Sequence, residues 1–570
     1  MITAHTAIDL ERACKVLGIE NLRPAQEEAI QSVLQDKHTL TVLPTGYGKT
    51  VIFQLPALMS KGVTVVFSPL IALMSDQVAK LGKVGIPARA LHSGIQAKAQ
   101  DRAMADIKAG QVKFVYCAPE RLNRSDFVGA LQALPIARIV VDEAHVMDEW
   151  EGDFRPAYAK IGEAVSQVHP RSVIAAPAPA GPRTVRVIEA SLGIRFTALH
   201  VLPPDRDNLT YRVVNGGSWA SIREFLHDQP TGHRGAIYCS TVREVEKLFA
   251  SLQPQAKQRL GKYHGQMAIN RREAIQEAFG KNEVDVMVCT NAFGLGIDYP
   301  DLRFVVHTGL CTSLDQYVQE QGRAGRDGKP STCVLFVPPD ARSTPEYFLK
   351  IKNPTVNHIK AVFMYYATHK ASVVRDSASL VAREALGHES QEPIVNTCKA
   401  VLRRANLINT WRDPAKARTV TFLANPRTLN LPWRADKQAL VLRVYDWIDR
   451  WGERDGETVR LKIESLVAAM PEIPETRLVQ YLLDLKKVGA LDVEADATQY
   501  CTRVQTREFK IDEDELEEKR KNDWAKYTAM LEYASYERST DEAREFIRSY
   551  FQTEEMQLRA MVDQTPEAMW

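Results

Sequence analysis

The sequence is poor in cysteine, and its cysteines are not spaced in the way that would hold a metal. Eight cysteines are scattered over 570 residues without a single C-x-x-C pair. Most lie in or beside apolar, strand-like runs, and these are Cys117, Cys239, Cys289, Cys311 and Cys333. Buried, unpaired thiols are typical of proteins in a reducing compartment. We therefore expect reduced core cysteines, a cytoplasmic location and no zinc site.

An excess of one charge and long apolar runs are also absent. The 73 basic and 71 acidic residues give a net charge of +2, so a nucleic-acid partner must be argued from local patches. No apolar run approaches membrane-spanning length, and the chain does not begin with a charged and then apolar signal. With 45% hydrophobic and 25% charged residues, we expect a soluble protein of about three to five domains without a membrane partner.

The sequence does contain a candidate phosphate-binding loop, Leu43-Pro44-Thr45-Gly46-Tyr47-Gly48-Lys49-Thr50. It follows an apolar run at 39–43, expected to be a buried strand, and it precedes residues 51–59, expected to be a helix. Strand, glycine-containing turn and helix form the context in which such a loop cradles phosphates. The strict pattern has glycine where Leu43 stands, so an ordinary glycine-containing turn is the alternative.

The residue types of this loop suit a nucleoside triphosphate with its metal. Gly46 and Gly48 would let backbone N–H groups wrap the phosphates without clashes from a Cβ atom. Lys49 would reach the β- and γ-phosphates of the nucleotide, and the Thr50 hydroxyl would bind Mg²⁺.

Five apolar runs predict a parallel sheet covered on both faces. These runs are residues 39–43, 63–67, 113–117, 139–142 and 172–176. Functional loops then belong at the carboxyl ends of the strands. The polar segments fall at these ends, at residues 45–50, 68–70, 119–121 and 142–145.

Asp142 and Glu143 end the fourth of these runs. An acidic residue in this place can bind Mg²⁺, and a neighbouring glutamate can orient and deprotonate the attacking water. A surface acidic pair at a helix start is the alternative. The presence of Lys49 upstream favours the catalytic interpretation.

A second α/β unit begins near Arg206, with strands expected at 235–239, 285–289, 303–307 and 332–337. It lacks a phosphate loop but carries Gln-Glu-Gln-Gly-Arg-Ala-Gly-Arg-Asp-Gly at residues 319–328. Arg323 and Arg326 would lie on one side of a helical turn. If they face a nucleotide on the first unit, they could neutralise the charge that develops on the γ-phosphate. A solvated arginine pair is the alternative.

Arg23 and Gln26 flank a proline near the N-terminus. A glutamine amide can pair with the edge of adenine through two hydrogen bonds, and Arg23 could support the base or a phosphate. A plain helix start with proline in its first turn is the alternative.

Residues of about 16–340 resemble the paired motor domains of superfamily-two helicases, and in particular the RecQ family of DNA helicases. Seven blocks carry the resemblance in order: Leu22–Gln26, Thr45–Thr50, Ser68–Gln77, Asp142–Tyr158, Tyr263–Gly265, Thr290–Asp298 and Gln319–Gly328. The resemblance implies an α/β fold with two tandem RecA-like domains. It also implies hydrolysis of Mg-ATP, 3′→5′ movement on single-stranded DNA and unwinding of duplex in DNA repair or recombination.

The resemblance assigns roles to residues at matching positions. The catalytic residues would be Glu143, Gln319, Arg323 and Arg326. The ATP-binding residues would be Arg23, Gln26, Thr45, Gly46, Gly48, Lys49, Thr50 and Asp142, with Thr50 and Asp142 also holding Mg²⁺. The DNA-binding residues would be Ser68, Trp150, Phe154, Arg155 and Thr290. Aromatic and guanidinium planes stack on unpaired bases, although an aromatic loop can also be purely structural.

The chain departs from the family in three places. Pro177 and Pro179 stand in the family's Thr-Ala-Thr-Ala-like segment, where they remove two hydroxyls and two backbone donors. Because that segment couples hydrolysis to strand separation, a translocase that unwinds poorly and a nucleotide-gated DNA-binding scaffold are alternatives. Ile19 replaces an aromatic residue, so stacking on the base should be weaker. The four cysteines of the family's zinc subdomain are missing.

Residues 354–423 and 437–511 each show three helices followed by two strands, the pattern of a winged helix. The third helix of each would present cations to DNA phosphates. These cations are Lys399, Arg403, Arg404, Arg477, Lys486 and Lys487. A winged helix that docks a protein is the alternative.

The chain ends with a charged stretch at 512–523, expected to be a solvated helix, and with a helical pair at 526–552. The sequence as a whole predicts five segments. They are 1–204 and 205–342 (RecA-like domains), 343–430 and 431–511 (winged-helix domains), and 512–570 (helical).

Overall fold

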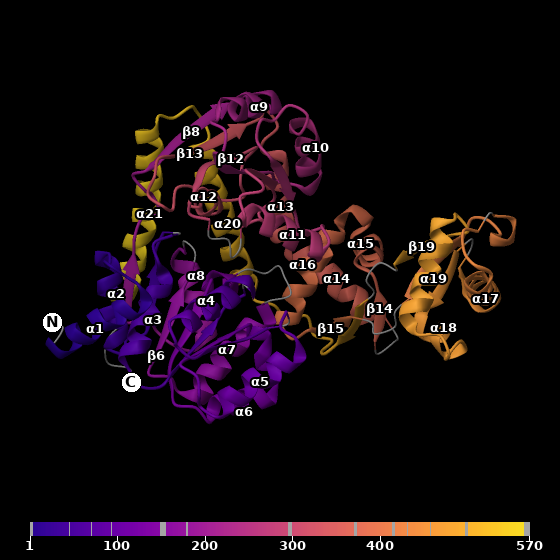
Figure 1. Ribbon diagram of the computed structural model, residues 1–570, viewed down its shortest axis with the longest axis horizontal. Helices are drawn as coiled ribbons and strands as arrows, with labels where there is room; N and C mark the ends of the chain where they lie inside the picture. The colour runs from indigo at the N-terminus through magenta and orange to yellow at the C-terminus, as the bar shows by residue number, and fades with distance from the viewer. Residues whose placement is uncertain are drawn as a thin grey trace. The chain divides into compact units, whose positions relative to one another are not determined.

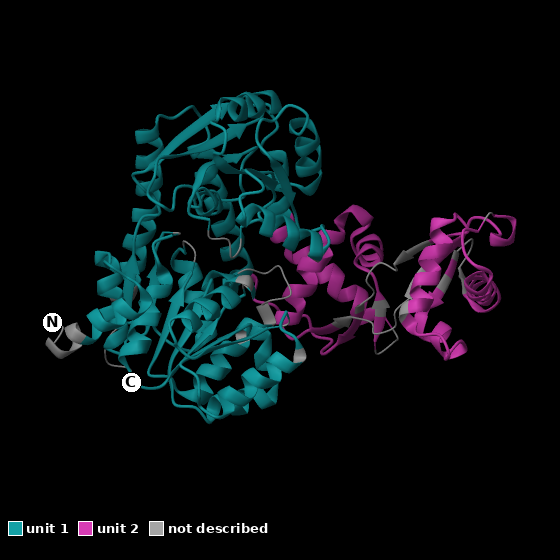
Figure 2. Ribbon diagram, viewed as in Figure 1, with its two compact units in different colours: residues 1–350, 514–570 teal, residues 351–513 magenta. Residues whose placement is uncertain are grey.

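The computed structural model describes residues 4–44, 46–69, 71–92, 94–148, 155–177, 180–294, 299–369, 373–412, 417–429, 431–455, 458–495 and 500–563. The chain divides into two units, which are coloured separately in Figure 2. Unit 1 comprises residues 1–350 and 514–570, and unit 2 comprises residues 351–513. Unit 1 contains two α/β lobes and a pair of C-terminal helices (Figure 1).

Lobe 1 is built on a parallel sheet with the strand order β3-β4-β2-β5-β6-β1-β7. Its strands are β1 (Thr39–Val42), β2 (Val63–Phe67), β3 (Ala88–Leu91), β4 (Phe114–Cys117), β5 (Ile136–Asp142), β6 (Ser172–Ala176) and β7 (Ala198–Val201). Neighbouring residues on one strand, such as Val65 and Val66, belong to two separate apolar clusters. Helices therefore cover both faces, which explains why the central strands are apolar throughout.

The helices of lobe 1 connect these strands. They are α1 (Ala4–Leu17), α2 (Pro24–Leu34), α3 (Lys49–Met59), α4 (Ile71–Lys83), α5 (Ala97–Lys108), α6 (Ser125–Gln132), α7 (Arg155–Val168) and α8 (Pro182–Leu192). Two 3₁₀ turns, η1 (Pro119–Asn123) and η2 (Ala144–Asp148), follow β4 and β5. The phosphate loop follows the carboxyl end of β1, and the acidic pair Asp142-Glu143 lies at the carboxyl end of β5.

Lobe 2 repeats the arrangement with a parallel sheet of order β10-β11-β9-β12-β13-β8. Its strands are β8 (Leu209–Asn215), β9 (Arg234–Tyr238), β10 (Leu260–Tyr263), β11 (Val286–Cys289), β12 (Leu302–His307) and β13 (Ser331–Val337). Its helices are α9 (Trp219–Asp228), α10 (Val242–Leu252), α11 (Ile269–Gly280) and α12 (Leu314–Gln321), and α13 (Ser343–Lys352) follows the last strand.

These two sheets confirm the expected α/β class with two parallel-sheet, RecA-like domains. Every strand predicted for the two lobes is present, and β3, β7, β8 and β10 were missed. All four missed strands lie at the edges of the sheets. An edge strand is only partly covered, so it lacks the continuous apolar run that marks a central strand. None of the described helices is both long and apolar enough to span a membrane.

The C-terminal helical pair consists of α20 (Glu513–Tyr533) and α21 (Thr540–Asp563). The helix expected at 512–523 is present as the first half of α20, and it carries the expected charge pairs at a spacing of four residues, such as Glu517–Lys521. Lys519 in its middle is only 2% exposed and pairs with Asp523 at 2.7 Å. Charges spaced four residues apart stabilise a helix, but they do not by themselves reveal which of its faces is covered.

Unit 2 contains further helices and two antiparallel sheets, of order β14-β20-β15 and β17-β18-β16-β19. The helices are α14 (Val356–Thr368), α15 (Ala378–Leu386), α16 (Glu392–Arg404), α17 (Ala435–Trp451), α18 (Ile463–Ala469) and α19 (Glu475–Lys487), with 3₁₀ turns η3 (Glu389–Gln391) and η4 (Pro426–Thr428). The strands are β14 (Val374–Asp376), β15 (Ile408–Arg412), β16 (Ala417–Phe422), β17 (Glu453–Asp455), β18 (Thr458–Lys462), β19 (Leu491–Ala495) and β20 (Tyr500–Val504).

The prediction that each half of unit 2 ends in its own β-hairpin is wrong. Strand β15 pairs with β20, while β16 pairs with β18 and β19, so the two halves exchange strands. The sequence pattern identifies strands, but it does not fix their partners when distant segments compete for the same edge. The assignment of winged-helix domains and the domain boundaries stay predictions.

Candidate nucleotide and hydrolysis site

The phosphate loop connects β1 to α3, as the sequence predicts. Gly46 and Gly48 adopt φ angles of +79° and +84°, the left-handed region that glycine tolerates best. Thr45 lies outside the described residues. A Cβ atom added to Gly46 would lie 3.0 Å from Cγ of Arg326. The missing side chain therefore leaves room for an arginine of lobe 2 against the loop of lobe 1.

Lys49 is the first residue of α3 and Thr50 is the second. Nζ of Lys49 donates a hydrogen bond to the backbone oxygen of Pro177, 3.0 Å away, in the segment after β6. Burial lowers the pKa of Lys49, Glu143 and Asp142 counteract that effect, and Arg326 lowers the pKa further. The lysine, both acids and the arginine thus share one electrostatic environment, as expected of a phosphate site.

Asp142 ends β5, and Glu143 follows it. Burial, and then the charge of Glu143, raise the pKa of Asp142 to about 7, while Lys49 and a hydrogen bond from Ser68 (3.1 Å) oppose the shift. This carboxylate lacks enough positive charge around it, and a divalent cation would supply that charge. The Asp142 carboxylate and the Thr50 hydroxyl are hard oxygen donors, so the site fits Mg²⁺.

Glu143 has a φ angle of +50°, which is unusual for a residue with a side chain. Its N–H donates to the backbone oxygen of Ala176 at 3.0 Å, and its Oε2 lies 3.4 Å from Nδ1 of His145. These partners hold the residue in a conformation that costs about 1–3 kcal/mol.

Arg23 and Gln26 contact the phosphate loop from α2. The Gln26 side-chain amide donates to the backbone oxygen of Tyr47 at 2.7 Å, and Arg23 Nη1 lies 3.3 Å from the backbone oxygen of Gly46. The Arg23 guanidinium also lies over the Tyr47 ring at 4.7 Å. The two residues that the sequence assigns to the base thus also support the loop that would hold the phosphates.

The paired arginines follow α12 in residues 322–326, which we call the arginine segment. Arg323 is 8% exposed, with its guanidinium against Gly294, and Arg326 is half-buried. Gln319 is half-buried near the end of α12.

The backbone of the arginine segment is held by Arg206 and Asn208, two residues that the sequence did not single out. Arg206 donates to the carbonyl oxygens of Gly322 (2.9 Å) and Gly325 (3.1 Å), and Asn208 donates to Gly325 at 2.8 Å. Both precede β8, a missed edge strand, and no motif marks them. Only the fold brings them to the arginine segment.

Of the five residues of the two lobes expected to contact DNA, two are buried and two lie outside the described residues. Ser68 and Thr290 are 2% and 8% exposed, and the Ser68 hydroxyl is directed to Asp142 and not to an open surface. Trp150 and Phe154 lie outside the described residues, and Arg155 is the first residue of α7.

The cations expected to face DNA in unit 2 fall into two groups. Arg404, Arg477, Lys486 and Lys487 are exposed and Arg403 is half-buried. Lys486 forms an ion pair with Asp492 at 2.7 Å. Lys399 does not face a phosphate, because it is 6% exposed and pairs with the buried Asp376 at 2.8 Å. That expectation was wrong because helical spacing alone did not show which face of α16 is buried.

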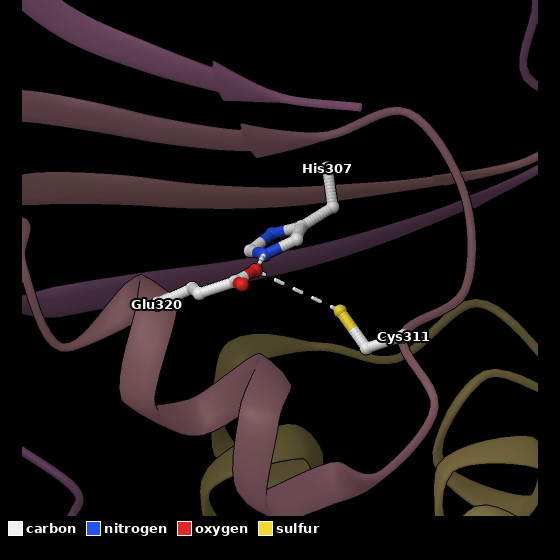
Figure 3. A group of neighbouring side chains, drawn as sticks. All are labelled: His307, Cys311 and Glu320. Atoms are coloured by element: carbon white, nitrogen blue, oxygen red, sulfur yellow. Dashed lines mark hydrogen bonds and ion pairs between the residues drawn. The ribbon is translucent and has the colours of Figure 1, made fainter. Parts of the chain in front are cut away.

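Lobe 2 also contains a buried group of possible metal ligands, His307, Cys311 and Glu320 (Figure 3). His307 Nε2 and Glu320 Oε2 form a hydrogen bond of 2.8 Å, and the Cys311 thiol points to the same oxygen at 3.9 Å. Burial, and then the charge of Glu320, raise the pKa of the thiol, which keeps it protonated. The group is therefore a hydrogen-bonded cluster that ties β12 to α12.

Two family models match the chain. The DEAD/DEAH box helicase model matches residues 23–186, and the helicase conserved C-terminal domain model matches residues 218–328. The first match covers the phosphate loop and acidic pair of lobe 1, and the second covers the arginine segment of lobe 2. Fold, site and matches together define the class as a superfamily-two helicase motor.

Curated relatives narrow the assignment. The chain is 37% identical over 324 residues to ATP-dependent DNA helicase RecQ of Bacillus subtilis (strain 168), covering 56% of this chain and 55% of that protein. It is 34% identical over 348 residues to the probable ATP-dependent DNA helicase RecS of the same organism, and the match covers 60% of this chain and 70% of RecS. ATP-dependent DNA helicase RecQ of Pasteurella multocida (strain Pm70) is 35% identical over 336 residues, and the match covers 59% of this chain and 52% of that protein. This chain belongs to the RecQ family, and it spans about half the length of these two RecQ proteins.

Proposed function

We propose that this protein is an ATP-dependent DNA helicase of RecQ type. It hydrolyses Mg-ATP, moves 3′→5′ along single-stranded DNA and unwinds duplex in DNA repair or recombination. Family membership supports this function, and so do the names of the relatives. The observation that carries the proposal is the approach of Arg326 in lobe 2 to Gly46 and Lys49 in lobe 1. A motor of this class needs both lobes to contribute to one hydrolysis site.

Each residue of the site has a defined task in this proposal. The loop around Gly46 and Gly48 and the Lys49 ammonium bind the phosphates, and Asp142 with Thr50 holds Mg²⁺, which polarises the phosphate oxygens when bound. Glu143 orients the attacking water and accepts its proton. Arg326 and Arg323 neutralise charge on the γ-phosphate as it is transferred.

DNA would cross both lobes in this proposal. We place Trp150, Phe154 and Arg155 on the single strand, because stacking on unpaired bases requires no particular sequence. Ser68 and Thr290 would follow the DNA backbone only after a change that uncovers them. Cations of α16 and α19 other than the buried Lys399 would hold the duplex by contacts with its phosphates, and these are Arg403, Arg404, Arg477, Lys486 and Lys487.

The test measures ATP hydrolysis and strand separation on 3′-tailed, 5′-tailed and blunt duplexes. We expect activity on the 3′-tailed substrate, and Glu143→Gln should reduce the DNA-stimulated kcat by about 10²–10⁴-fold with DNA binding retained. Glu163→Gln, on an exposed side chain of α7, is the matched control. Hydrolysis that is unchanged in Glu143→Gln would disprove the proposed base, and unwinding from a 5′ tail would disprove the direction.

A translocase that separates strands poorly is the second candidate. The observation that favours it is Pro177, which has no hydroxyl or backbone N–H and meets Lys49 only through its carbonyl oxygen. Fast hydrolysis without unwinding would support this candidate. Replacing both Pro177 and Pro179 with threonine should then restore unwinding. RNA strands in parallel assays would show whether DNA is the preferred substrate.

A further inference from the structure

The C-terminal helical pair packs on both motor lobes. The first half of α21 and the second half of α20 belong to the apolar core of lobe 2 through Tyr527, Met530, Tyr533, Ala543, Ile547 and Phe551. Near its end, α21 places Leu558 in the core of lobe 1, with Met561 packed against that core. A single helix therefore extends from one lobe to the other, as Figure 1 shows for α21.

The pair also makes polar contacts with α12, the helix that leads into the arginine segment. Asp315 in the first turn of α12 accepts hydrogen bonds from Lys526 Nζ at 3.2 Å and from the Tyr550 hydroxyl at 3.1 Å. Asp315 is only 9% exposed. A buried carboxylate with two such donors is held firmly, because losing one donor would leave part of its charge buried without a partner.

The same face of α21 reaches the segment that follows β6 in lobe 1. A Cβ atom on Gly181 would lie 2.8 Å from Oε1 of Glu554, so only a glycine lets the carboxylate approach so closely. Glu554 and Leu558 also line a small cavity together with Pro44 and Ala180. The helix thus lies beside the start of the phosphate loop and beside the segment whose Pro177 holds Lys49.

A second set of contacts ties α21 to the chain between the lobes. Arg544 and Arg548 form ion pairs with Asp205 at 3.2 and 2.7 Å, and the side chain of Asp205 is 1% exposed. The next residue, Arg206, holds the backbone of the arginine segment. Two separate routes therefore lead from α21 to this segment, through Asp315 and through Asp205.

We propose that the C-terminal helical pair couples the two lobes, and that Asp315, Lys526, Tyr550 and Glu554 are positioning residues for hydrolysis. They fix α12, and with it the arginine segment, relative to Gly181 of lobe 1. The pair thereby supplies a mechanical link between the two lobes. This inference rests on the proposed function, because positioning has a consequence only if the site hydrolyses ATP.

The test uses the full chain with Lys526→Met, the conservative Lys526→Arg and the control Glu545→Gln, which changes an exposed residue of α21. Lys526→Met should lower the DNA-stimulated kcat about tenfold, which corresponds to about 1.4 kcal/mol in the barrier. The KM for ATP should stay within about twofold, because the phosphate contacts of lobe 1 are untouched. Lys526→Arg should keep at least half of the kcat, and Glu545→Gln all of it.

Hydrogen–deuterium exchange without nucleotide provides a readout that does not depend on activity. In Lys526→Met, exchange should rise both in residues 314–321 of lobe 2 and in residues 182–192 of lobe 1. Increased exchange confined to lobe 2, or an unchanged kcat, would overturn the proposal. If Lys526→Met does not fold, Tyr550→Phe removes one donor to Asp315 and should show the same pattern more weakly. A wild-type chain without ATPase activity would refute the proposed function, while the exchange pattern would still decide whether the helices link the lobes.

Discussion

The charge state of Glu554 should make the stability of the protein depend on pH. This side chain is half-buried on α21 and faces Asp315 of α12, Lys526 of α20 and Tyr550 of its own helix. Burial, and then the charge of Asp315, raise the pKa of Glu554 to about 7, and Lys526 opposes the shift. The folded protein therefore holds this proton more tightly than the unfolded chain does.

The direction of the effect follows from the raised pKa. The contribution of Glu554 to stability is fully present below its ordinary pKa of 4.5 and is lost as the pH rises through about 7. Between pH 6 and pH 8.5, the loss amounts to at most about 1.4 kcal/mol. Because the side chain keeps some contact with water, about 1 kcal/mol is the better expectation.

Glu554→Gln removes the titrating group and keeps the shape of the side chain. Urea unfolding followed by tryptophan fluorescence should show the variant gaining about 1 kcal/mol on the wild type between pH 6 and pH 8.5. Glu545→Gln, the exposed control on the same helix, should follow the wild type at both pH values. Identical pH responses of Glu554→Gln and the wild type would refute the argument that this carboxylate is desolvated against α12.

Three further predictions concern other parts of the chain. Gly46→Ala should raise the KM for ATP about tenfold, because alanine disfavours the positive φ angle there and its Cβ atom would crowd the Arg326 side chain. Gly85 also has a positive φ angle but open space around it, so Gly85→Ala should leave the KM unchanged. Arg206→Ala should lower kcat about tenfold with little change in KM, because the backbone of the arginine segment loses a hydrogen-bond donor. A tenfold rise in KM would contradict this reason. Asp376→Ala leaves the Lys399 ammonium buried without its carboxylate partner, so thermal unfolding should show unit 2 destabilised by about 3–5 kcal/mol. A destabilisation below about 1 kcal/mol would contradict the burial of this pair.

The hydrolysis site that we propose was derived almost entirely from the sequence. Lys49, Asp142 and Arg326 lie in short segments whose residue types are fixed by phosphate and metal chemistry, so they could be recognised without coordinates. The DNA-contacting residues are a weaker case. Ser68 was assigned by resemblance alone, and in this structure its hydroxyl donates a hydrogen bond to Asp142, so its contact with DNA stays a prediction.

The strands of unit 2 show why the remaining features could not be predicted. Strand β15 was placed almost correctly, but its partner β20 lies far along the chain. Alternation of residue types indicates a strand and the face that it buries. The partner of that strand depends on which other strand, however distant in the sequence, has an unpaired edge beside it in the fold. The edge strands β7 and β8 were missed for a related reason, since a partly covered strand carries no continuous apolar run.

The sequence by itself determined the two α/β lobes and the residues that we propose for binding phosphate, metal and water. These follow from local patterns, because a phosphate loop or a buried strand is specified by neighbouring residues. Only the tertiary structure decided that α21 bridges both lobes and that Arg206 holds the arginine segment. Those contacts join segments hundreds of residues apart, and their energy comes from burial and ion pairing that no local pattern encodes.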